Sequence, residues 1–404
     1  MNSGMTGKQS ILKCLLNFIE MDKRKIAILG STGSIGTQAL EVIASHSQEF
    51  EVYAISANNS VDLLIEQARK YNPEVVAIAN TAHYCTLKAA LADLPVKVFA
   101  GEDAICQMVE MEPVDMVLAS MVGFAGLKPT IHAIKAGKAL ALANKETLVV
   151  AGELVTALAN EYKVPILPVD SEHSAVFQSI VGESFDTIEK IILTASGGPF
   201  RNFTREQLLT VTKEQALKHP NWDMGAKITI DSASMMNKGF EVIEAKWLFG
   251  VPYSKIEVVV HPQSIIHSMV QYHDGAIKAQ LGVPDMKLPI QYAFSYPKRL
   301  GSAFDRISFD TLTELTFQKP DVERFPNLGL AYQAIRDGAS MPCVLNAANE
   351  VCVAAFLHDR IGFLQMSSVI EKTMSRVALV RNPSLEDYLE IDRESRRIAE
   401  ELIG

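Results

Sequence analysis

Short apolar runs alternate with amphipathic segments along the first part of the chain. The segments between the runs, such as 60–71 and 147–162, place apolar residues at helical spacing. The runs are apolar on both faces, as strands inside a parallel sheet must be, and cover residues 25–29, 51–56, 75–79, 96–99, 115–120, 139–143 and 164–169. Because such strands need helical crossovers, the pattern predicts an α/β fold with an N-terminal doubly wound parallel sheet, Rossmann-like in arrangement.

The pattern changes after residue 170. A long helix is predicted at 233–249, and strands at 188–194, 227–230, 256–261, 268–273 and 276–281. Asp274-Gly275 is a hairpin signal between the last two of these strands. The elements predict an α+β domain rather than another doubly wound repeat.

The end of the chain reads as helical. Residues 317–327 contain Pro320 and Pro326 and predict a loop, which is followed by helical patterns at 328–337, 347–358, 367–377 and 385–403. We therefore expect three domains, with 317–327 as a linker before the last: residues 21–169, 170–316 and a small helical domain at 328–404.

Residues 1–20 stand apart from these domains. Residues 8–20 have apolar positions at helical spacing, but the segment lacks the basic start and small-residue cleavage site of a secretory signal. We interpret residues 1–20 as an extension upstream of a more natural start at Met21, with a docking helix as the alternative.

Composition narrows the class of protein. The chain has 48% hydrophobic and 21% charged residues, which excludes disorder as the main architecture. Its 47 acidic and 38 basic side chains give a net charge of −9, so we expect neither nucleic-acid binding nor attachment to anionic membranes. The longest apolar run, 116–127, is shorter than the about 20 residues of a membrane span. Five scattered cysteines without a C-x-x-C pair favour a reducing, cytoplasmic location.

A glycine-rich turn, Gly30-Ser-Thr-Gly33-Ser-Ile-Gly36, follows the first predicted strand and opens the first helix. Glycines let the backbone approach a phosphate, and a helix N-terminus offers unpaired N–H groups, so the turn predicts dinucleotide binding, with a tight packing turn as the alternative. The second strand ends at Ala57-Asn58-Asn59 without the acidic residue typical of NAD enzymes, which favours NADP.

Two polar motifs follow later strands, at the sheet edge where such folds bind ligands. Asn144-Lys145-Glu146 follows one strand, and Asp170-Ser171-Glu172-His173 follows the next. If the chain stays extended, Asp170 and Glu172 point to one side and suit Mg²⁺ or Mn²⁺. The alternative for each motif is a helix start, with Lys145 and Glu146 as a charge pair on the first turn of one helix and Ser171 as the N-cap of the other.

Further polar groups come from the α+β domain. Asn237 and Glu241 share one helix face, with Lys238 beside them and Ser232 near the start of that helix. Ser196-Gly-Gly is a second candidate phosphate turn. A solvated helix face with ordinary caps is the alternative.

The segment from His219 to Gly225 is a loop that contains Trp222, one of two tryptophans. An aromatic residue there is either a core plug or a lid over a site. His261 and His267 occur in a predicted strand region, where a histidine is more often an ordinary core group.

Together these motifs resemble the 1-deoxy-D-xylulose 5-phosphate reductoisomerase family. The matching stretches occur in family order: GSTGSIG (30–36), ALANKE (141–146), LPVDSEH (167–173), TASGGPFR (194–201), HPNW (219–222), MMNKGFE (235–241), HPQSIIHSMV (261–270), PDM (284–286) and LNAANE (345–350). The resemblance implies an NADPH-binding domain, a catalytic and dimerisation domain and a helical domain in a homodimer. It also implies rearrangement of a phosphorylated sugar and its reduction to 2-C-methyl-D-erythritol 4-phosphate, on the route to isoprenoids.

The resemblance also implies roles for individual residues. The implied metal ligands are Asp170, Glu172 and Glu241. The implied substrate contacts are Lys145, Ser171, Glu172, Ser196, His219, Trp222 as the lid, Ser232, Asn237, Lys238 and Glu241, of which Lys145, Glu172, His219 and Glu241 are expected to be catalytic. The implied NADPH contacts are Thr32, Gly33, Ser34, Ile35, Ala57, Asn58, Asn59, Asn144, Glu146, Gly225 and Met286.

The chain departs from the family pattern at two positions. Asn58 stands where a basic residue is frequent, and Asp223 where a small hydroxyl residue is frequent. Two alternatives to this function are an NADP-dependent semialdehyde dehydrogenase, which needs a nucleophilic cysteine, and a nucleotide-sensing module, which would not need the carboxylates.

Overall fold

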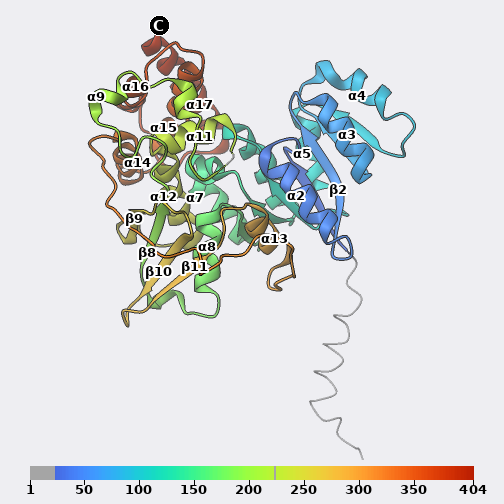
Figure 1. Cartoon of the computed structure of the whole chain (residues 1–404). Helices are drawn as coiled ribbons and strands as arrows, with labels where there is room; N and C mark the ends of the chain where they lie inside the picture. Colours follow the sequence, from blue (N-terminus) through green and yellow to red (C-terminus); the bar gives the residue numbers. More distant parts are fainter. Residues whose placement is uncertain (1–22, 223) are drawn as a thin grey trace, which may run out of the picture.

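The computed structural model describes residues 23–222 and 224–404 (Figure 1). The predicted extension at residues 1–20 and the departure at Asp223 therefore lie outside the described residues. The chain forms two lobes side by side: a smaller first lobe contains residues 24–110, and a larger lobe contains residues 145–161 together with most of the later chain (Figure 1).

The first lobe is built on a seven-stranded parallel sheet, as predicted. Its strands are β1 (Arg24–Leu29), β2 (Phe50–Ala57), β3 (Val75–Ile78), β4 (Lys97–Ala100), β5 (Met116–Ala119), β6 (Ala139–Leu142) and β7 (Ile166–Pro168). Their order in the sheet is β4-β3-β2-β1-β5-β6-β7, so the direction of winding reverses between β1 and β5. Open α/β sheets bind ligands beyond the carboxyl ends of the strands at such a point.

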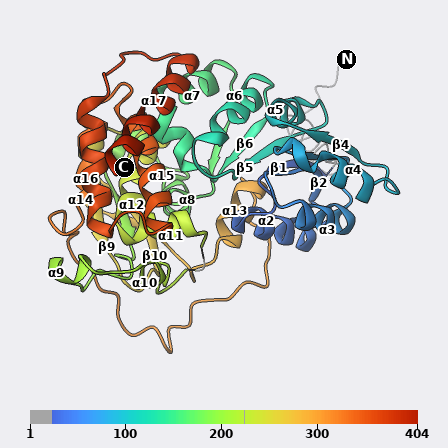
Figure 2. The same ribbon diagram turned by 90° about the horizontal axis from the view of Figure 1, so that it is seen from above.

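Helices cover both faces of this sheet (Figure 2). In β1, Ile26 and Ile28 face one core and Ala27 and Leu29 face the other, because side chains alternate along a strand. The first core includes α2 (Ser34–Ser45), α3 (Val61–Tyr71), α4 (Tyr84–Ala90) and the later α13 (Lys287–Ser295). The second includes α5 (Glu102–Glu110), α6 (Leu127–Lys135) and α7 (Lys145–Glu161).

A mixed four-stranded sheet forms the base of the larger lobe. It is made of β8 (Ile188–Ala195), β9 (Ile256–Val260), β10 (Ile266–Tyr272) and β11 (Ile277–Leu281), in the order β11-β10-β8-β9. The predicted hairpin is confirmed, since β10 and β11 pair antiparallel and the Gly275 N–H donates to the Tyr272 carbonyl at 2.9 Å. Helix α8 (Ser171–Ile180) connects the two sheets, because it starts at the end of β7 and packs against β10 and β11.

The strand predicted at 227–230 is wrong. These residues belong to helix α11 (Ala226–Ala233), where Lys227 and Asp231, four residues apart, form an ion pair of 2.8 Å. The β-branched residues favoured a strand locally, but tertiary contacts override so weak a preference. The long helix α12 (Met236–Phe249) begins three residues later than the predicted 233, because Met235 has a positive φ of 63° that separates this helix from α11.

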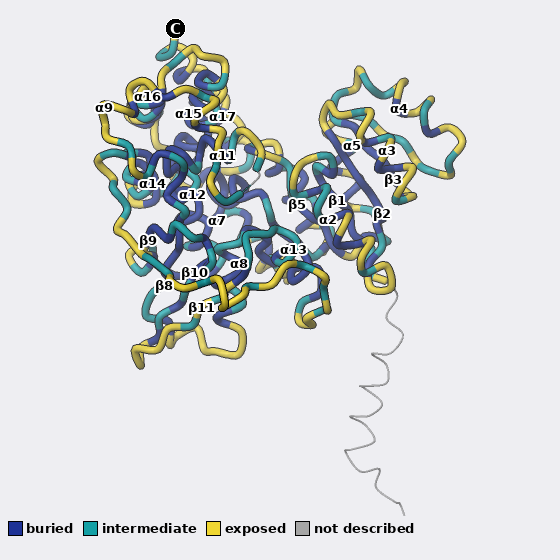
Figure 3. The backbone as a smooth tube through the Cα atoms, viewed as in Figure 1, coloured by how far each residue is buried: buried dark blue, intermediate teal, exposed yellow. Residues whose placement is uncertain are grey.

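Four helices form the last part of the chain, as predicted: α14 (Pro326–Asp337), α15 (Met341–Leu357), α16 (Phe363–Arg376) and α17 (Leu385–Ile403). Helix α15 starts six residues earlier than predicted and is buried along most of its length (Figure 3). It packs on α7 as well as on α16 and α17, so its apolar residues continue the core of the larger lobe.

Shorter elements complete the chain. The helices α9 (Arg205–Leu208) and α10 (Lys213–Ala216) each start with a capping box and lead from β8 towards His219. Helix α12 ends at Phe249. No helix within residues 23–222 and 224–404 is long and apolar enough to cross a membrane.

The close contact at Gly36 gives a test of the fold. A Cβ atom at Gly36 would lie 2.3 Å from the Gly30 carbonyl oxygen, so Gly36→Ala must displace the glycine-rich turn. We expect a loss of about 1–3 kcal/mol of stability, measured by urea unfolding.

Gly329→Ala is the matched control, because a Cβ atom at this position in α14 meets open space. It should be neutral or stabilising by up to about 1 kcal/mol. Equal effects of the two substitutions would contradict the close contact at Gly36.

Candidate active site

The predicted substrate and metal residues line one cavity of about 150 Å³ between the two sheets. They are Lys145, Asp170, Ser171, Glu172, Ser196, His219, Trp222, Ser232, Asn237, Lys238 and Glu241. Ser34, Ile35, Gly225 and Met286 from the predicted nucleotide set line the same cavity. The other nucleotide candidates do not line it: Thr32, Gly33, Ala57, Asn58, Asn59, Asn144 and Glu146.

Three carboxylates meet in this cavity. Asp170 lies at the N-cap of α8, Glu172 in its first turn, and Glu241 on α12. One oxygen of each lies within 4.8 Å of the others. Of the two conformations that the sequence allows for 170–172, the helix start is confirmed, although Asp170 rather than Ser171 is the N-cap. The helix start still brings the two carboxylates to one side.

Two lysines from different helices offset the charge of these carboxylates. Lys145, in the first turn of α7, contacts Asp170 and lies 3.3 Å from Glu241 Oε1, and it donates to Asn237 Oδ1 at 2.9 Å. Lys238 contacts Glu241 and donates to Glu172 Oε1 at 2.7 Å. The lysines and carboxylates therefore form one buried network.

The protonation equilibria of this network follow from burial and from neighbouring charges. Burial raises the pKa of Glu241 to about 7, with Glu172 acting in the same direction. Burial alone would lower the pKa of Lys145, but the Asp170 and Glu241 charges outweigh it and raise this pKa well above its usual range. A further positive charge would therefore stabilise the ionised form of Glu241.

His219 presents a neutral N–H group to the cavity. Its Nδ1 accepts from the N–H groups of Asn221 at 3.2 Å and Trp222 at 3.0 Å, so the proton of a neutral ring lies on Nε2. Burial lowers the pKa of His219 to about 4. Nε2 lies 3.0 Å from Ser196 Oγ, which places two polar groups together at one end of the cavity.

The turn after Ser196 brings two further elements to the same place. Gly198 has a φ of +68°, and a Cβ atom there would lie 2.8 Å from the Ser232 carbonyl oxygen. This close approach packs the turn against the end of α11, so Ser196 and Ser232 line the same cavity although they are far apart in the sequence.

The segment around Trp222 lies against the mixed sheet. The Trp222 and His267 ring centroids are 6.0 Å apart, and the Asn221 side chain donates to Ser264 Oγ at 2.8 Å and to the Pro262 carbonyl at 2.7 Å. Trp222 is half-buried and lines the cavity, so it borders the site rather than filling the core.

The glycine-rich turn leads from β1 into α2 at the reversal point of the sheet. Beneath it, Ser31 Oγ donates to Gln67 Oε1 at 2.7 Å, and the Gln67 amide donates back to the Ser31 carbonyl at 2.9 Å. Gly33 is the N-cap of α2 and has no side chain that could accept hydrogen bonds from the first N–H groups of the helix. These N–H groups are therefore available to bind a phosphate.

The other nucleotide candidates surround this turn. Ala57 ends β2, which neighbours β1, and Asn58 and Asn59 are exposed directly after it. Asn144 caps α7 and donates to the Gly123 carbonyl at 2.9 Å, and the Glu146 carboxylate contacts Lys227. Asn144 and Glu146 are thus engaged by the protein itself.

Sequence reasoning missed two charged residues near the site. Lys227 fell in the segment interpreted as a strand, and only the helix α11 reveals that it joins Glu146 to Asp231. Glu244 lies three residues after Glu241, so helical spacing alone placed it on the same face of α12. That spacing was the signal that could have found it.

Three comparisons agree on one family. Profiles described as 1-deoxy-D-xylulose 5-phosphate reductoisomerase match residues 26–152, and those of its C-terminal domains match 166–249 and 281–398. The chain is 69% identical over 384 residues to the enzyme of that name from Bacteroides fragilis, covering 95% of this chain and 99% of that one. It is 70% identical over 381 residues to the enzyme of the same name from Bacteroides thetaiotaomicron, and the alignment covers 94% of this chain and 98% of that one.

Solved structures give the same result. The Zymomonas mobilis reductoisomerase in complex with NADPH superposes with a TM-score of 0.89 at 45% identity, covering 95% of this chain and 100% of that one. A DOX-P reductoisomerase in complex with NADPH, fosmidomycin and magnesium gives 0.89 at 38% identity, covering 94% and 98%. The chain belongs to the 1-deoxy-D-xylulose 5-phosphate reductoisomerase family.

Proposed function

We propose that this protein converts 1-deoxy-D-xylulose 5-phosphate to 2-C-methyl-D-erythritol 4-phosphate, using NADPH and a divalent cation, Mg²⁺ or Mn²⁺, in isoprenoid synthesis. The observation that carries the proposal is the single cavity that joins three carboxylates and two lysines to the start of α2. A nucleotide-sensing module would have no use for the carboxylates.

The donor set fits a hard divalent cation. Asp170, Glu172 and Glu241 would hold it, because all three offer oxygen atoms within 4.8 Å of one another and lie largely out of water. When bound, such a cation polarises the substrate carbonyl and the neighbouring hydroxyl as a Lewis acid, which favours the carbon–carbon rearrangement.

Lys145 and Ser171 would contact oxygen atoms of the substrate. We assign Lys145 to the negative charge that develops on a substrate oxygen, since its ammonium group is held among Asp170, Asn237 and Glu241. Ser171 Oγ donates to Glu172 Oε2 at 2.6 Å and lines the cavity, so it can both orient that carboxylate and contact a substrate hydroxyl.

The polar end of the cavity suits the substrate phosphate. We assign this phosphate to hydrogen-bond donors from four separate segments: Ser196, His219, Ser232, Asn237 and Lys238. The proton on Nε2 makes His219 a donor at neutral pH, since its pKa of about 4 keeps the ring uncharged. Because the phosphate itself does not react, the free energy of its binding can stabilise closure over the site.

When bound, NADPH would supply the hydride for the second step. We place its pyrophosphate at Thr32, Gly33, Ser34 and Ile35, with Ala57, Asn58 and Asn59 near the ribose. Gly225 and Met286 line the cavity beside Ser34 and Ile35, where the nicotinamide would lie. Asn144 would shape this region through its hydrogen bond to Gly123, and Glu146 through its contact with Lys227. Trp222 would form the lid that excludes water.

The semialdehyde dehydrogenase alternative lacks support. Cys85 is exposed and Cys106, Cys343 and Cys352 are buried, and none of these four described cysteines lines the cavity. That chemistry needs a cysteine nucleophile at the reacting carbon.

We also propose that the protein is cytoplasmic and that its domains comprise residues 21–169, 170–316 and 328–404. We further propose that two copies of the chain form a homodimer. Ile277 and Leu281 are exposed on β11, an edge strand of the mixed sheet. An edge strand with exposed apolar residues suits pairing with a second copy.

The direct test is NADPH oxidation, followed by absorbance, with 1-deoxy-D-xylulose 5-phosphate and Mg²⁺ or Mn²⁺. We expect turnover that stops when a chelator removes the cation. No NADPH oxidation with either cation would contradict the proposed function.

Glu241→Gln should abolish turnover and leave NADPH binding within about twofold of the wild type. The amide removes one negative ligand while the side chain keeps its shape, and the glycine-rich turn is untouched. Glu257→Gln, on the exposed face of β9, is the matched control and should keep full activity. Loss of NADPH binding by fluorescence titration in Glu241→Gln would mean that this residue is structural.

The protein should prefer NADPH to NADH, as measured by kcat/KM. Asn58→Asp should reduce this preference by about tenfold, because a carboxylate repels the 2′-phosphate and accepts from a free ribose hydroxyl, and one factor of ten is about 1.4 kcal/mol. Asn72→Asp, at the C-cap of α3, is the control. An unchanged ratio in Asn58→Asp would place the 2′-phosphate elsewhere.

A further inference from the structure

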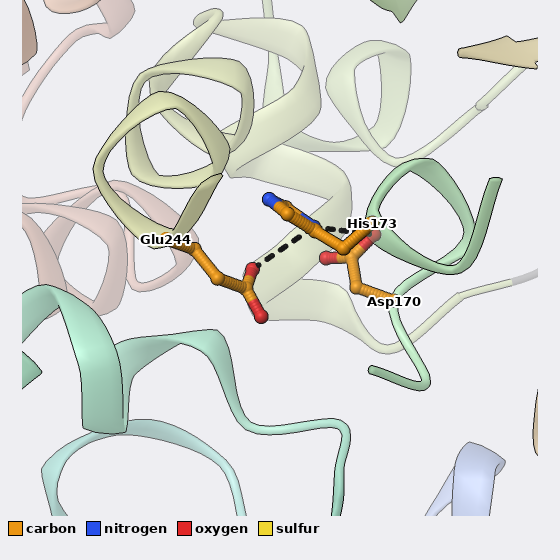
Figure 4. A group of neighbouring side chains, drawn as sticks. All are labelled: Asp170, His173 and Glu244. Carbon is orange, nitrogen blue, oxygen red and sulfur yellow. Dashed lines mark ion pairs between the residues drawn. The ribbon is translucent and has the colours of Figure 1, made fainter. Parts of the chain in front are cut away.

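A buried carboxylate without a role in the proposed reaction lies directly behind the cation site. Glu244 projects from α12 and has no exposed surface. It does not line the cavity, and among the described residues neither of its carboxylate oxygens makes a hydrogen bond. Figure 4 shows it pointing towards His173, beside Asp170.

The ring of His173 connects Glu244 to two of the proposed cation ligands. His173 Nδ1 lies 3.3 Å from Glu244 Oε2 and 3.8 Å from Asp170 Oδ1. On the other side of the ring, Nε2 is 2.9 Å from the main-chain carbonyl oxygen of Glu241. One imidazole therefore touches both α8 and α12, the helices that carry the three ligands.

The ring has little freedom to turn. It is fully buried and stacks on Phe249, with centroids 6.3 Å apart and an interplanar angle of 13°. A flip of the ring would move a nitrogen away from the Glu241 carbonyl and place carbon against the two carboxylates. Nδ1 makes no hydrogen bond among the described residues, so its attraction to Glu244 and Asp170 is electrostatic, and it favours the orientation in which both nitrogens face oxygen.

A buried carboxylate costs free energy, and an apolar side chain of similar size would fit the interior at lower cost. The buried position of Glu244 is explained if this residue orients a neighbouring group that takes part in the reaction. Outer residues that orient metal ligands are a common use of such groups, and their loss typically lowers metal affinity by about 10–100-fold.

We propose that Glu244 is a positioning residue for the divalent-cation site and acts through His173. By fixing the ring, Glu244 holds the Asp170 carboxylate and the Glu241 segment of α12 at the separation that a shared cation requires. The inference rests on the proposed function only in assigning Asp170, Glu172 and Glu241 as ligands.

The test is Mn²⁺ binding to the full-length protein, read from the electron paramagnetic resonance signal of free Mn²⁺. Glu244→Gln keeps the shape of the side chain, and we expect its dissociation constant for Mn²⁺ to rise about 10–100-fold, with NADPH affinity unchanged. In the assay, the Mn²⁺ concentration for half-maximal rate should rise by a similar factor, and excess Mn²⁺ should restore much of kcat.

Asp392→Asn is the matched control. This carboxylate is also buried, but it lies on α17 and pairs with Arg396. The substitution should lower the Tm without changing Mn²⁺ affinity. If Glu244→Gln does not fold, Glu244→Asp keeps the charge and withdraws the oxygens by one methylene, and it should weaken Mn²⁺ binding in the same direction.

Two results would overturn the proposal. Wild-type Mn²⁺ affinity in a folded Glu244 variant with a lowered Tm would make Glu244 purely structural. A second Mn²⁺ bound per chain and lost in Glu244→Gln would mean that Asp170, His173 and Glu244 hold a cation themselves. Because binding is measured without substrate, failure of the proposed reaction would leave this measurement intact.

Discussion

The gathering of three carboxylates in a largely water-excluded cavity is the constraint on which the rest of the site depends. Asp170, Glu172 and Glu241 repel one another, and burial removes the water that would weaken this repulsion. Lys145 and Lys238 supply two positive charges, so the cluster carries one negative charge in excess when all three carboxylates are ionised. A bound cation would complement the carboxylates, and the lysines would complement the negatively charged oxygens of the substrate. The carboxylate cluster thus contributes to the net negative charge of the chain.

The fold brings this cluster together from elements that end at the same place. The carboxyl ends of β1, β6 and β7 present the glycine-rich turn, Lys145 and Asp170 at one edge of the large sheet. Helix α12 brings Glu241 and Asn237 from the other lobe, and α11 carries Ser232 beside them. Because α12 packs on both α7 and α14, the ligand helix is anchored in the common core rather than on a loop.

Much of the arrangement could be predicted from the sequence, and the failures are local. The parallel sheet was predictable because each strand is apolar on both faces, a pattern that few other structures tolerate. The segment 227–230 has a strand-like sequence because Ile228, Thr229 and Ile230 favour strands, whereas the helix that it forms depends on packing and on the pair between Lys227 and Asp231. At residues 170–172 the sequence allows both an extended continuation of the strand and a helix start, and the structure has the helix, with Asp170 at the N-cap position.

The sequence by itself determined the alternation of strands and helices, the glycine-rich turn and the identity of the residues that the family motifs contain. These features depend on periodicity and on side chains within a few residues of one another. Only the tertiary structure decided that His173 faces Glu244 and the Glu241 carbonyl, and that Lys227 joins Glu146 to Asp231. Such contacts depend on how α8, α11 and α12 pack against their neighbours, and no local pattern encodes the distance between helices that lie far apart in the chain.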